Sequence, residues 1–342
     1  MRPVASASEE EATEALLINR HAERLAERHG ARVWRLGLDG GFGCPNRPPA
    51  LNEGGDGRGR GGCIYCAPSA SRAPYAQGAS IAEQLGAALA FARRRYGARL
   101  FFPYFQAFSS TWAPVDVLRR RYDEALRALE AMAPGSGRGL VISTRPDCVD
   151  EEKAALLASY AGRGLEVWVE LGLQSGRDST LARIRRGHTV GDFMRACRLL
   201  ALPGLRVAAH LILGLPGENR NDMLAGTRLV SSLHLAGVKF HDLHVPRGSI
   251  LAGEYLGGEV TLLSRTSYLE VLADAIELLA PETEIIRIAT DSPETERFAP
   301  RAAFDKAALY RGLEEVLASR ETRQGSGFSQ GGGNSLAGEN GI

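Results

Sequence analysis

The hydrophobic positions of this chain form short apolar runs, and longer stretches with helical spacing separate them. Six of these runs predict buried strands, at residues 32–38, 99–105, 139–143, 165–171, 207–213 and 238–244. Between the second and third runs, Pro114 precedes Val115, Leu118, Tyr122 and Leu126, which recur at helical spacing. Strands that alternate with helices in this way indicate a parallel sheet with crossover helices, and therefore an α/β fold.

Six strand–helix units predict an open, partial barrel. Asp150 precedes Glu151 and Glu152, and this order predicts a helix that begins with a capping carboxylate and an acidic first turn. In barrels and doubly wound sheets, ligands collect on the loops that follow the carboxyl ends of the strands. We therefore look for functional residues in those loops.

The two ends of the chain depart from the alternating pattern. Residues 14–29 predict an N-terminal helix, and beyond residue 262 a helix to 279, a strand at 284–289 and a helix at 302–318 follow. We divide the chain into a polar start with a helix (1–30), a barrel core (31–260), a C-terminal α/β extension (261–323) and a tail (324–342). The Gly/Ser composition of the tail is typical of a flexible segment.

Composition narrows the class of protein. The chain has 342 residues and is 44% hydrophobic, which is enough for a large core and excludes global disorder. Its 41 basic and 40 acidic residues give a net charge of +1, so total charge indicates no polyanionic partner and no membrane surface. We find no apolar stretch that could cross a bilayer and no signal peptide, and we predict a cytoplasmic protein.

Three of the five cysteines lie in a Gly-rich segment directly after the first predicted strand. Cys63 and Cys66 have the C-x-x-C spacing that lets two thiolates reach one metal centre, and Cys44 supplies a third. Structural zinc sites normally have four ligands, whereas three thiolates suit a 4Fe–4S cluster with one open iron. A zinc site or a redox pair is the alternative, because C-x-x-C occurs in both. Cys148 and Cys197 are expected to be small buried hydrophobic residues.

Seven motifs follow one another along residues 20–318. They are Cys-Pro-Asn-Arg at 44, Gly-Gly-Cys-Ile-Tyr-Cys at 61, Tyr-Phe-Gln-Ala-Phe at 104, Thr-Arg-Pro-Asp at 144, Glu-Leu-Gly-Leu-Gln-Ser at 170, Arg-Arg-Gly-His at 185 and His-Leu-Ile-Leu-Gly-Leu-Pro-Gly-Glu at 210. Together they resemble the radical S-adenosylmethionine (SAM) superfamily, in particular the uncharacterised bacterial YhcC-type proteins. Those proteins are similar to the radical SAM domain of the Elongator catalytic subunit.

The resemblance implies a partial (β/α)6 barrel of the radical SAM type in which Cys44, Cys63 and Cys66 hold a 4Fe–4S cluster. It implies that the open iron chelates SAM, and that one electron from a donor such as flavodoxin or ferredoxin cleaves SAM. The resulting 5′-deoxyadenosyl radical takes a hydrogen atom from a substrate, which is unknown here. The segment between Cys44 and Cys63 is longer than usual in the superfamily, with padding at 48–50 and 52–57. Loop-closure entropy grows slowly with length, so this insertion need not abolish cluster binding.

The first candidate SAM contacts follow the first three strands. Tyr65 occupies the position that lies near the adenine in the family, with simple packing in the loop as the alternative. Gln106 stands where the family commonly has a Gly-Gly-Glu that engages the amino group of SAM, or else merely begins a loop. Ser143 and Arg145 end the third strand, and Arg145 could bind a carboxylate or phosphate or pair with an acidic neighbour.

The fourth and fifth strands carry further candidates. Glu170 interrupts an apolar strand, which is costly without a partner, and ribose hydroxyls or an arginine could supply one. Gln174 is a second polar candidate at the same strand end. The fifth strand contains Ile212, Gly214 and Gly217 in a pattern that resembles the adenine-support element of the family, where glycines permit close backbone approach. An ordinary strand and turn is the alternative, and His210, at the start of this pattern, is expected to be a satisfied core histidine.

Two basic groups follow the later strands. One consists of Arg183, Arg185, Arg186 and His188, which predicts either a solvated face or a phosphate contact. On the sixth strand, alternation places Lys239 and His241 on one side. If that side faces the barrel interior, these two residues would line a substrate pocket.

The leading hypothesis is a radical SAM enzyme of unknown substrate. A non-catalytic iron–sulfur or zinc regulatory protein would need the cysteines but not the strand-end residues. A tRNA-modifying radical SAM enzyme is suggested by the Elongator resemblance and the arginines, but the chain has no net basic charge and no recognisable acetyltransferase region or RNA-binding domain.

Overall fold

The computed structural model describes residues 17–47, 62–67, 69, 72–76 and 78–329. The N-terminal helix, α1 (His21–His29), begins later than the predicted residue 14, and residues 14–16 lie outside the described part of the chain. The padding between Cys44 and Cys63 and the tail beyond residue 329 also lie outside it.

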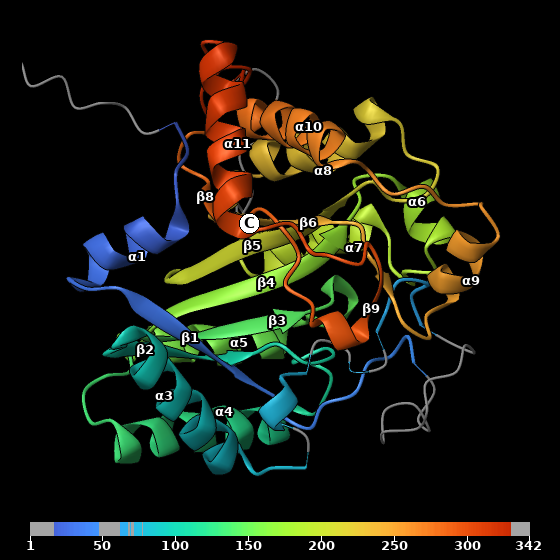
Figure 1. The fold of residues 1–342 in the computed structure, drawn as a ribbon. Helices are drawn as coiled ribbons and strands as arrows, with labels where there is room; N and C mark the ends of the chain where they lie inside the picture. Colours follow the sequence, from blue (N-terminus) through green and yellow to red (C-terminus); the bar gives the residue numbers. More distant parts are fainter. Residues whose placement is uncertain (1–16, 48–61, 68, 70–71, 77, 330–342) are drawn as a thin grey trace, which may run out of the picture.

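A parallel sheet of seven strands, in the order β1-β2-β3-β4-β5-β6-β8, forms the centre of the molecule. It curls into an open half-barrel with helices on its outer side (Figure 1). The six predicted strands are confirmed as β1 (Val33–Leu38), β2 (Leu100–Phe105), β3 (Gly139–Thr144), β4 (Glu166–Gln174), β5 (Leu205–Leu213) and β6 (Gly237–Asp242). The predicted partial-barrel α/β fold is therefore confirmed.

The seventh strand comes from the segment predicted as a C-terminal extension. β8 (Glu284–Arg287) pairs in parallel with β6, with Glu284 opposite Gly237 and Arg287 opposite Lys239. The strand predicted at 284–289 thus continues the barrel sheet. A short antiparallel pair, β7 (Val245–Pro246) and β9 (Arg297–Ala299), stands apart from that sheet.

The helices begin where the sequence offers capping side chains. Asp150 accepts a hydrogen bond from the backbone N of Lys153 (2.9 Å), which confirms the predicted cap of α5. The remaining helices and 3-10 turns are η1 (Pro74–Ala76), α3 (Ile81–Tyr96), α4 (Val115–Met132), η2 (Pro146–Cys148), α5 (Glu151–Ala161), α6 (Asp178–Arg183), α7 (Val190–Leu199), α8 (Arg220–Ser232), α9 (Ile250–Leu256), α10 (Arg265–Leu278), η3 (Glu294–Glu296) and α11 (Lys306–Ser319). No helix in the described residues is both long and apolar enough to span a membrane.

The inside of the half-barrel is layered along the strands. An apolar layer near the amino ends of the strands contains Leu25, Phe102, Val141, Trp168 and Ala208, which are all buried. Burial of such side chains is the main stabilising contribution to a core. The next layer toward the carboxyl ends is polar, and a cavity follows it. This order separates the stabilising part of the interior from the part that can bind a ligand.

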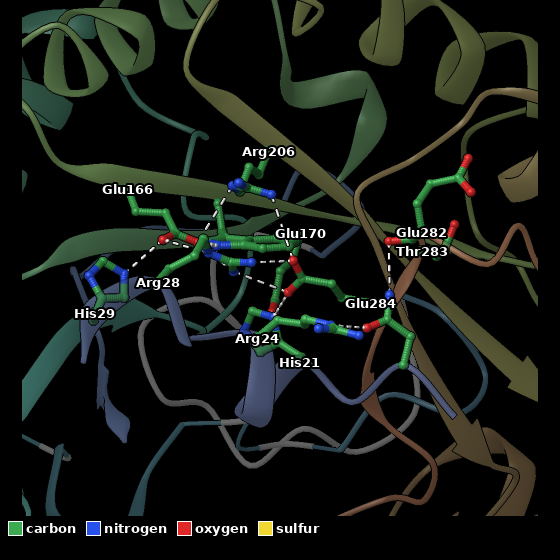
Figure 2. A network of polar contacts seen from close by, with 12 residues as sticks. His21, Arg24, Arg28, His29, Glu166, Glu170, Arg206, Glu282, Thr283 and Glu284 are labelled. Atoms are coloured by element: carbon green, nitrogen blue, oxygen red, sulfur yellow. Dashed lines mark hydrogen bonds and ion pairs between the residues drawn. The ribbon is translucent and has the colours of Figure 1, made fainter. Parts of the chain in front are cut away.

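The N-terminal segment connects the two edges of the open sheet. Arg20 forms a parallel bridge with Ile285 of β8, and α1 contacts both β1 and β8. Figure 2 shows α1 side chains directed at acidic groups on β4 and β8. Arg28 donates to Glu284 (2.6 Å) and to Glu166 (2.9 Å).

Two histidines of α1 complete this network. His21 Nδ1 lies 2.6 Å from Glu284, and His29 Nε2 lies 2.7 Å from Glu166. Burial opposes ionisation of both carboxyls, but hydrogen bonds from the α1 side chains hold the pKa of each below its ordinary value. Helix α1 therefore closes the amino end of the half-barrel with paired charges.

The start of the predicted tail packs on the body of the protein. Gln324 is buried, its Nε2 donates to the backbone O of Ala280 (2.9 Å), and its side-chain O accepts from the backbone N of Asn19 (2.9 Å). Hydrogen bonds thus hold residues 324–327 against residues 17–19 and against the end of α10 and the loop that follows it. The Gly/Ser composition suggested flexibility, but it did not reveal that one polar side chain satisfies several buried backbone groups.

Candidate functional site

A cavity of about 440 Å³ lies at the carboxyl ends of the barrel strands. Its walls contain nine of the twelve predicted site residues: Cys44, Cys63, Tyr65, Cys66, Gln106, Ser143, Arg145, Gln174 and Ile212. Glu170, Gly214 and Gly217 do not line it. The structure therefore brings together residues that lie up to 168 positions apart in the sequence, from Cys44 to Ile212.

The cysteine loop is fixed from the side by two later segments of the chain. Ile64 N donates to Ile184 O (3.1 Å), and Leu251 N donates to Ile64 O (2.9 Å). The side chain of Ile64 is buried in a cluster with Ile184 and Leu251. A further backbone hydrogen bond, from Cys66 N to Cys63 O (3.0 Å), closes the C-x-x-C turn. The turn is thus held in place by backbone hydrogen bonds and apolar packing on both sides of Ile64.

Two side chains donate hydrogen bonds to the sulfur of Cys63. Asn46 Nδ2 lies 3.3 Å from Cys63 Sγ, and Arg186 Nη1 lies 3.6 Å from it. Burial raises the pKa of Cys63, but the charges of Arg186 and Arg145 and the two hydrogen bonds outweigh this effect and lower that pKa below its ordinary value. By contrast, burial raises the pKa of the Cys66 thiol to about 11. Of these two thiols, the site therefore makes Cys63 the easier one to ionise.

The positions of Asn46 and Arg186 were not predicted. Both lie inside motifs noted in the sequence, Cys-Pro-Asn-Arg at 44 and Arg-Arg-Gly-His at 185, and that was the available signal. Arg186 is buried and also donates to Gly172 O (2.8 Å). A β-carbon on Gly172 would stand 2.5 Å from Arg186 Nη2, so the glycine makes room for the guanidinium.

The chemistry of the three thiols fits an iron–sulfur cluster, since cysteine thiolates are the ligands that hold such clusters. In the described part of the chain, no three or more His, Cys, Asp or Glu side chains form a group that could hold a metal ion. The fit consequently rests on three cysteines in one cavity wall and on the donors that stabilise a thiolate at Cys63. It does not rest on an assembled coordination sphere.

Two amide side chains from the carboxyl ends of β2 and β4 reach the same cavity. A β-carbon on Gly37 would stand 2.9 Å from Gln106 Nε2, so this glycine leaves space for the Gln106 side chain. Gln174 has a φ of 74°, a left-handed conformation that is rare outside glycine, and the register between β4 and β5 shifts between Leu171 and Gln174. Such strain persists where surrounding structure imposes it, often at functional sites.

Arg145 lies in the cavity wall, and its guanidinium already donates hydrogen bonds to an acidic neighbour. Its Nε and Nη2 donate to the two carboxylate oxygens of Asp147 (2.9 and 2.8 Å), and Nη1 donates to Arg186 O (2.8 Å). Arg145 therefore pairs with an acidic neighbour, which was the alternative to binding a ligand carboxylate or phosphate. The bidentate pair fixes the guanidinium at the edge of the cysteine site.

The structure gives Glu170 protein partners, and its contact with SAM stays a prediction. Its carboxylate is fully buried below the cavity and is bonded by Arg35 on one oxygen. The other oxygen accepts from Tyr104 Oη (2.7 Å), His210 Nε2 (3.0 Å) and Lys239 Nζ (2.6 Å). All of these partners are protein side chains, so the ion-pair alternative holds and no ribose contact is needed to explain the buried acid.

The adenine-support pattern divides into two roles. Ile212 lines the cavity, whereas Gly214 and Gly217 do not. Gly214 has a φ of 92° and Gly217 a φ of 85°, values that other residues rarely adopt. The two glycines thus shape the turn after β5 and do not themselves form the cavity wall. His210, which donates to Glu170, is a satisfied interior histidine as predicted.

The predicted basic patch does not form one surface. Arg183 pairs with Glu254 (2.8 Å), whereas Arg186 is buried beside Cys63. On β6, Lys239 and His241 both face the cavity, which confirms the predicted interior side of that strand. Cys148 and Cys197 are buried, and burial raises the pKa of each to about 12, in agreement with their predicted role as small apolar residues.

Comparisons with known proteins agree with this architecture. The family model of the Radical SAM superfamily matches residues 58–229, and the model of the Radical_SAM C-terminal domain matches residues 235–318. Protein YhcC of Escherichia coli (strain K12) is 37% identical over 284 residues, which cover 83% of this chain and 87% of that protein.

Two further proteins are similar either over a smaller share of the chain or at lower sequence identity. A tRNA uridine(34) acetyltransferase of Dehalococcoides mccartyi is 30% identical over 188 residues, which cover 54% of this chain and 39% of that protein. The solved structure of archaeal Methanocaldococcus infernus Elp3 with an N-terminal deletion has a TM-score of 0.60 and 20% identity, and covers 85% of this chain and 64% of that one. At this identity the structural likeness bears on the fold alone.

Proposed function

Because the chain belongs to the radical SAM superfamily, whose members use a 4Fe–4S cluster and SAM, we propose that it is an enzyme that cleaves SAM reductively at the cavity described above. The observation that carries this proposal is the meeting of three cysteines with polar side chains from separate strand ends in one cavity. A non-catalytic iron–sulfur or zinc protein would not require those strand-end side chains.

In this proposal Cys44, Cys63 and Cys66 hold the cluster. When bound, the cluster and SAM supply a 5′-deoxyadenosyl radical that removes a hydrogen atom from the substrate. Asn46 and Arg186 stabilise negative charge on the Cys63 sulfur, and their hydrogen bonds support the sulfur from the protein side.

The remaining wall residues would orient SAM. Gln106 and Gln174 offer amide groups to polar parts of SAM, Ser143 offers a hydroxyl, and Ile212 and Tyr65 offer apolar surface for the adenine. Arg145, held by Asp147, presents a fixed cation near the cysteine loop. An external reductant such as flavodoxin or ferredoxin would deliver the electron.

The decisive experiment is anaerobic. The full-length protein is reconstituted with iron and sulfide, mixed with SAM and dithionite, and analysed for 5′-deoxyadenosine by chromatography. We expect this product to form in proportion to cluster content. If no product forms while the visible spectrum verifies the cluster, the proposal is wrong.

Cysteine variants test the ligand assignment with controls from the same chain. Cys44→Ala, Cys63→Ala and Cys66→Ala are each expected to lose the brown cluster absorbance. The reason is that each variant removes one of the three cysteines that line the cavity and would hold the cluster. The matched controls Cys148→Ala and Cys197→Ala remove thiols that do not line the cavity, so they should retain it. Equal loss of absorbance in all five variants would contradict the assignment.

We propose a tRNA-modifying activity as the second candidate, supported by the 30% identity to a tRNA uridine(34) acetyltransferase over about half of this chain. The test is whether tRNA co-purifies with the protein above the background of an unrelated protein of similar charge. Absence of RNA, together with no change in the modified nucleosides of a deletion strain, would contradict this candidate.

A further inference from the structure

The three adjacent strands β5, β6 and β8 place basic side chains side by side along the inner wall of the cavity. His210 lies opposite Lys239 in the register of β5 and β6, and Lys239 lies opposite Arg287 in the register of β6 and β8. All three residues line the cavity, as does His241. We call these four residues, His210, Lys239, His241 and Arg287, the basic wall.

Carboxylates only partly balance the charge of this wall. Glu170 faces two cations, Arg35 and Lys239, so a single buried acid serves both. Arg287 makes no side-chain hydrogen bond among the described residues, and its ion pair with Asp291 is long, at 3.9 Å. Asp291 itself lies 2.5 Å from Lys306. One cation of the wall is therefore poorly compensated.

The other acidic side chain on this side of the cavity is also occupied. Glu296 accepts a hydrogen bond from Ser69 Oγ (2.6 Å). His241 adds an independent observation, because its Nε2 is buried without a hydrogen-bond partner in the described residues although the side chain lines the cavity. Buried polar nitrogens are normally paired, so this atom indicates a missing partner.

Neighbouring positive charges also lower the pKa values of the basic side chains in this wall. Burial is the main reason that the pKa of Lys239 falls to about 7 and that of His210 to about 4. Repulsion from Arg287 contributes to both shifts, and Glu170 opposes both. The pKa of His241 is likewise held well below its ordinary value, first by burial and then by its cationic neighbours. An anion placed here would relieve this repulsion.

We propose that the basic wall binds an oxyanion, a carboxylate or a phosphate, of the substrate. Arg287 would supply charged donors, and His241 would supply the neutral donor whose nitrogen has no partner in the described residues. The assignment of this ligand as substrate rests on the proposed function, but binding of an oxyanion at the wall does not.

Calorimetric titration of the full-length, cluster-loaded protein tests the proposal. Inorganic phosphate and sodium acetate are titrated separately, each with and without saturating SAM, so that a carboxylate of SAM cannot be mistaken for the ligand. We expect saturable binding of at least one probe that survives the presence of SAM. The preferred probe distinguishes a phosphate substrate from a carboxylate substrate.

Variants assign the binding to the wall. Arg287→Gln should weaken binding at least about tenfold, because it removes a charge-assisted contact, whereas Arg287→Lys should stay within about threefold of the wild type. Arg94→Gln removes an exposed arginine of α3 outside the cavity and should change nothing. Should the first variant fold poorly, His241→Leu against His241→Gln provides a second comparison, with loss expected for leucine alone.

Three results would overturn the proposal: no saturable binding of either probe, equal affinity in Arg287→Gln, or complete displacement of the probe by SAM. The proposed function fails separately, because SAM binding and 5′-deoxyadenosine formation are measured without any probe. An anion site could thus be found in a protein that does not cleave SAM, and the two failures remain distinguishable.

Discussion

Replacing Glu170 by glutamine would remove the charge that two buried cations share. Glu170 is fully buried and receives hydrogen bonds from four side chains, two of which, Arg35 and Lys239, are cationic. Burial opposes ionisation of Glu170, but Lys239 and Arg35 hold its pKa well below the ordinary value. Because two cations contact the carboxylate, we take it to be ionised at neutral pH.

Breaking a buried ion pair by removing one partner typically costs about 3 to 5 kcal/mol. We expect Glu170→Gln to lower the free energy of unfolding by this amount. Lys239→Met should cost less, about 1 to 3 kcal/mol, because Arg35, Tyr104 and His210 still satisfy the remaining carboxylate. Lys239 is almost fully buried, so the methionine side chain stays out of water.

The double variant distinguishes a coupled network from separate contacts. Once the carboxylate is gone, Lys239 either keeps an unbalanced buried charge or loses its proton, and both are costly. Glu170→Gln with Lys239→Met should therefore be more stable than the sum of the single losses by about 1 to 3 kcal/mol. The assay is urea unfolding followed by circular dichroism under anaerobic conditions. Additivity to within about 0.5 kcal/mol would refute the reasoning.

An exposed ion pair offers the matched control. Asp116 and Arg120 lie 2.6 Å apart on α4, with side chains 65% and 67% exposed. Solvent screens such pairs, so the same cycle at these positions should give a coupling much smaller than that between Glu170 and Lys239. A similar coupling at both sites would mean that burial does not strengthen the Glu170 network.

Two further predictions concern stability. His21 and His188 are buried, and burial lowers the pKa of each to about 4. Between about pH 6.5 and pH 4 the unfolded chain therefore binds more protons than the folded protein does. The free energy of unfolding must consequently fall as the pH falls through that window. The loss is at most about 1.4 kcal/mol per pH unit and histidine, and equal urea midpoints at pH 7.5 and 5.5 would contradict it. A β-carbon on Gly176 would stand 2.4 Å from the backbone N of Gly226, so Gly176→Ala should destabilise by about 1 to 3 kcal/mol. Gly86 lies on α3 with open space around it, so Gly86→Ala should instead stabilise the protein by about 0.5 to 1 kcal/mol in the same urea assay. Equal urea midpoints for the two alanine variants would contradict the close approach of Gly176 to Gly226.

The periodicity of the sequence was sufficient to locate the six strands of the barrel. Strand burial and helix spacing are local properties, and the C-x-x-C spacing is local as well, so the six strands could be located before the structure was known. The same reasoning placed Lys239 and His241 on the inner side of β6, where the structure has them. What periodicity describes is therefore which face of an element is buried.

Pairings between distant residues could not be predicted in this way. Arg35 and Glu170 are 135 positions apart, and Cys63 and Arg186 are 123 positions apart. Local spacing carries no information about which of several interior polar side chains will meet. For the same reason β8 was assigned to an extension, because a strand of four residues gives no sign of the sheet that it joins.

The closure of the half-barrel by α1 also bears on where this protein can be cut. An expression boundary at the start of β1 would remove Arg28, His21 and His29, and would leave Glu166 and Glu284 inside the sheet without those hydrogen-bond partners. It would also leave the edge of β8 without the bridge from Arg20. The short helix outside the region matched by the family models is thus integral to the barrel, and chimaeras with relatives should exchange it together with β4 and β8.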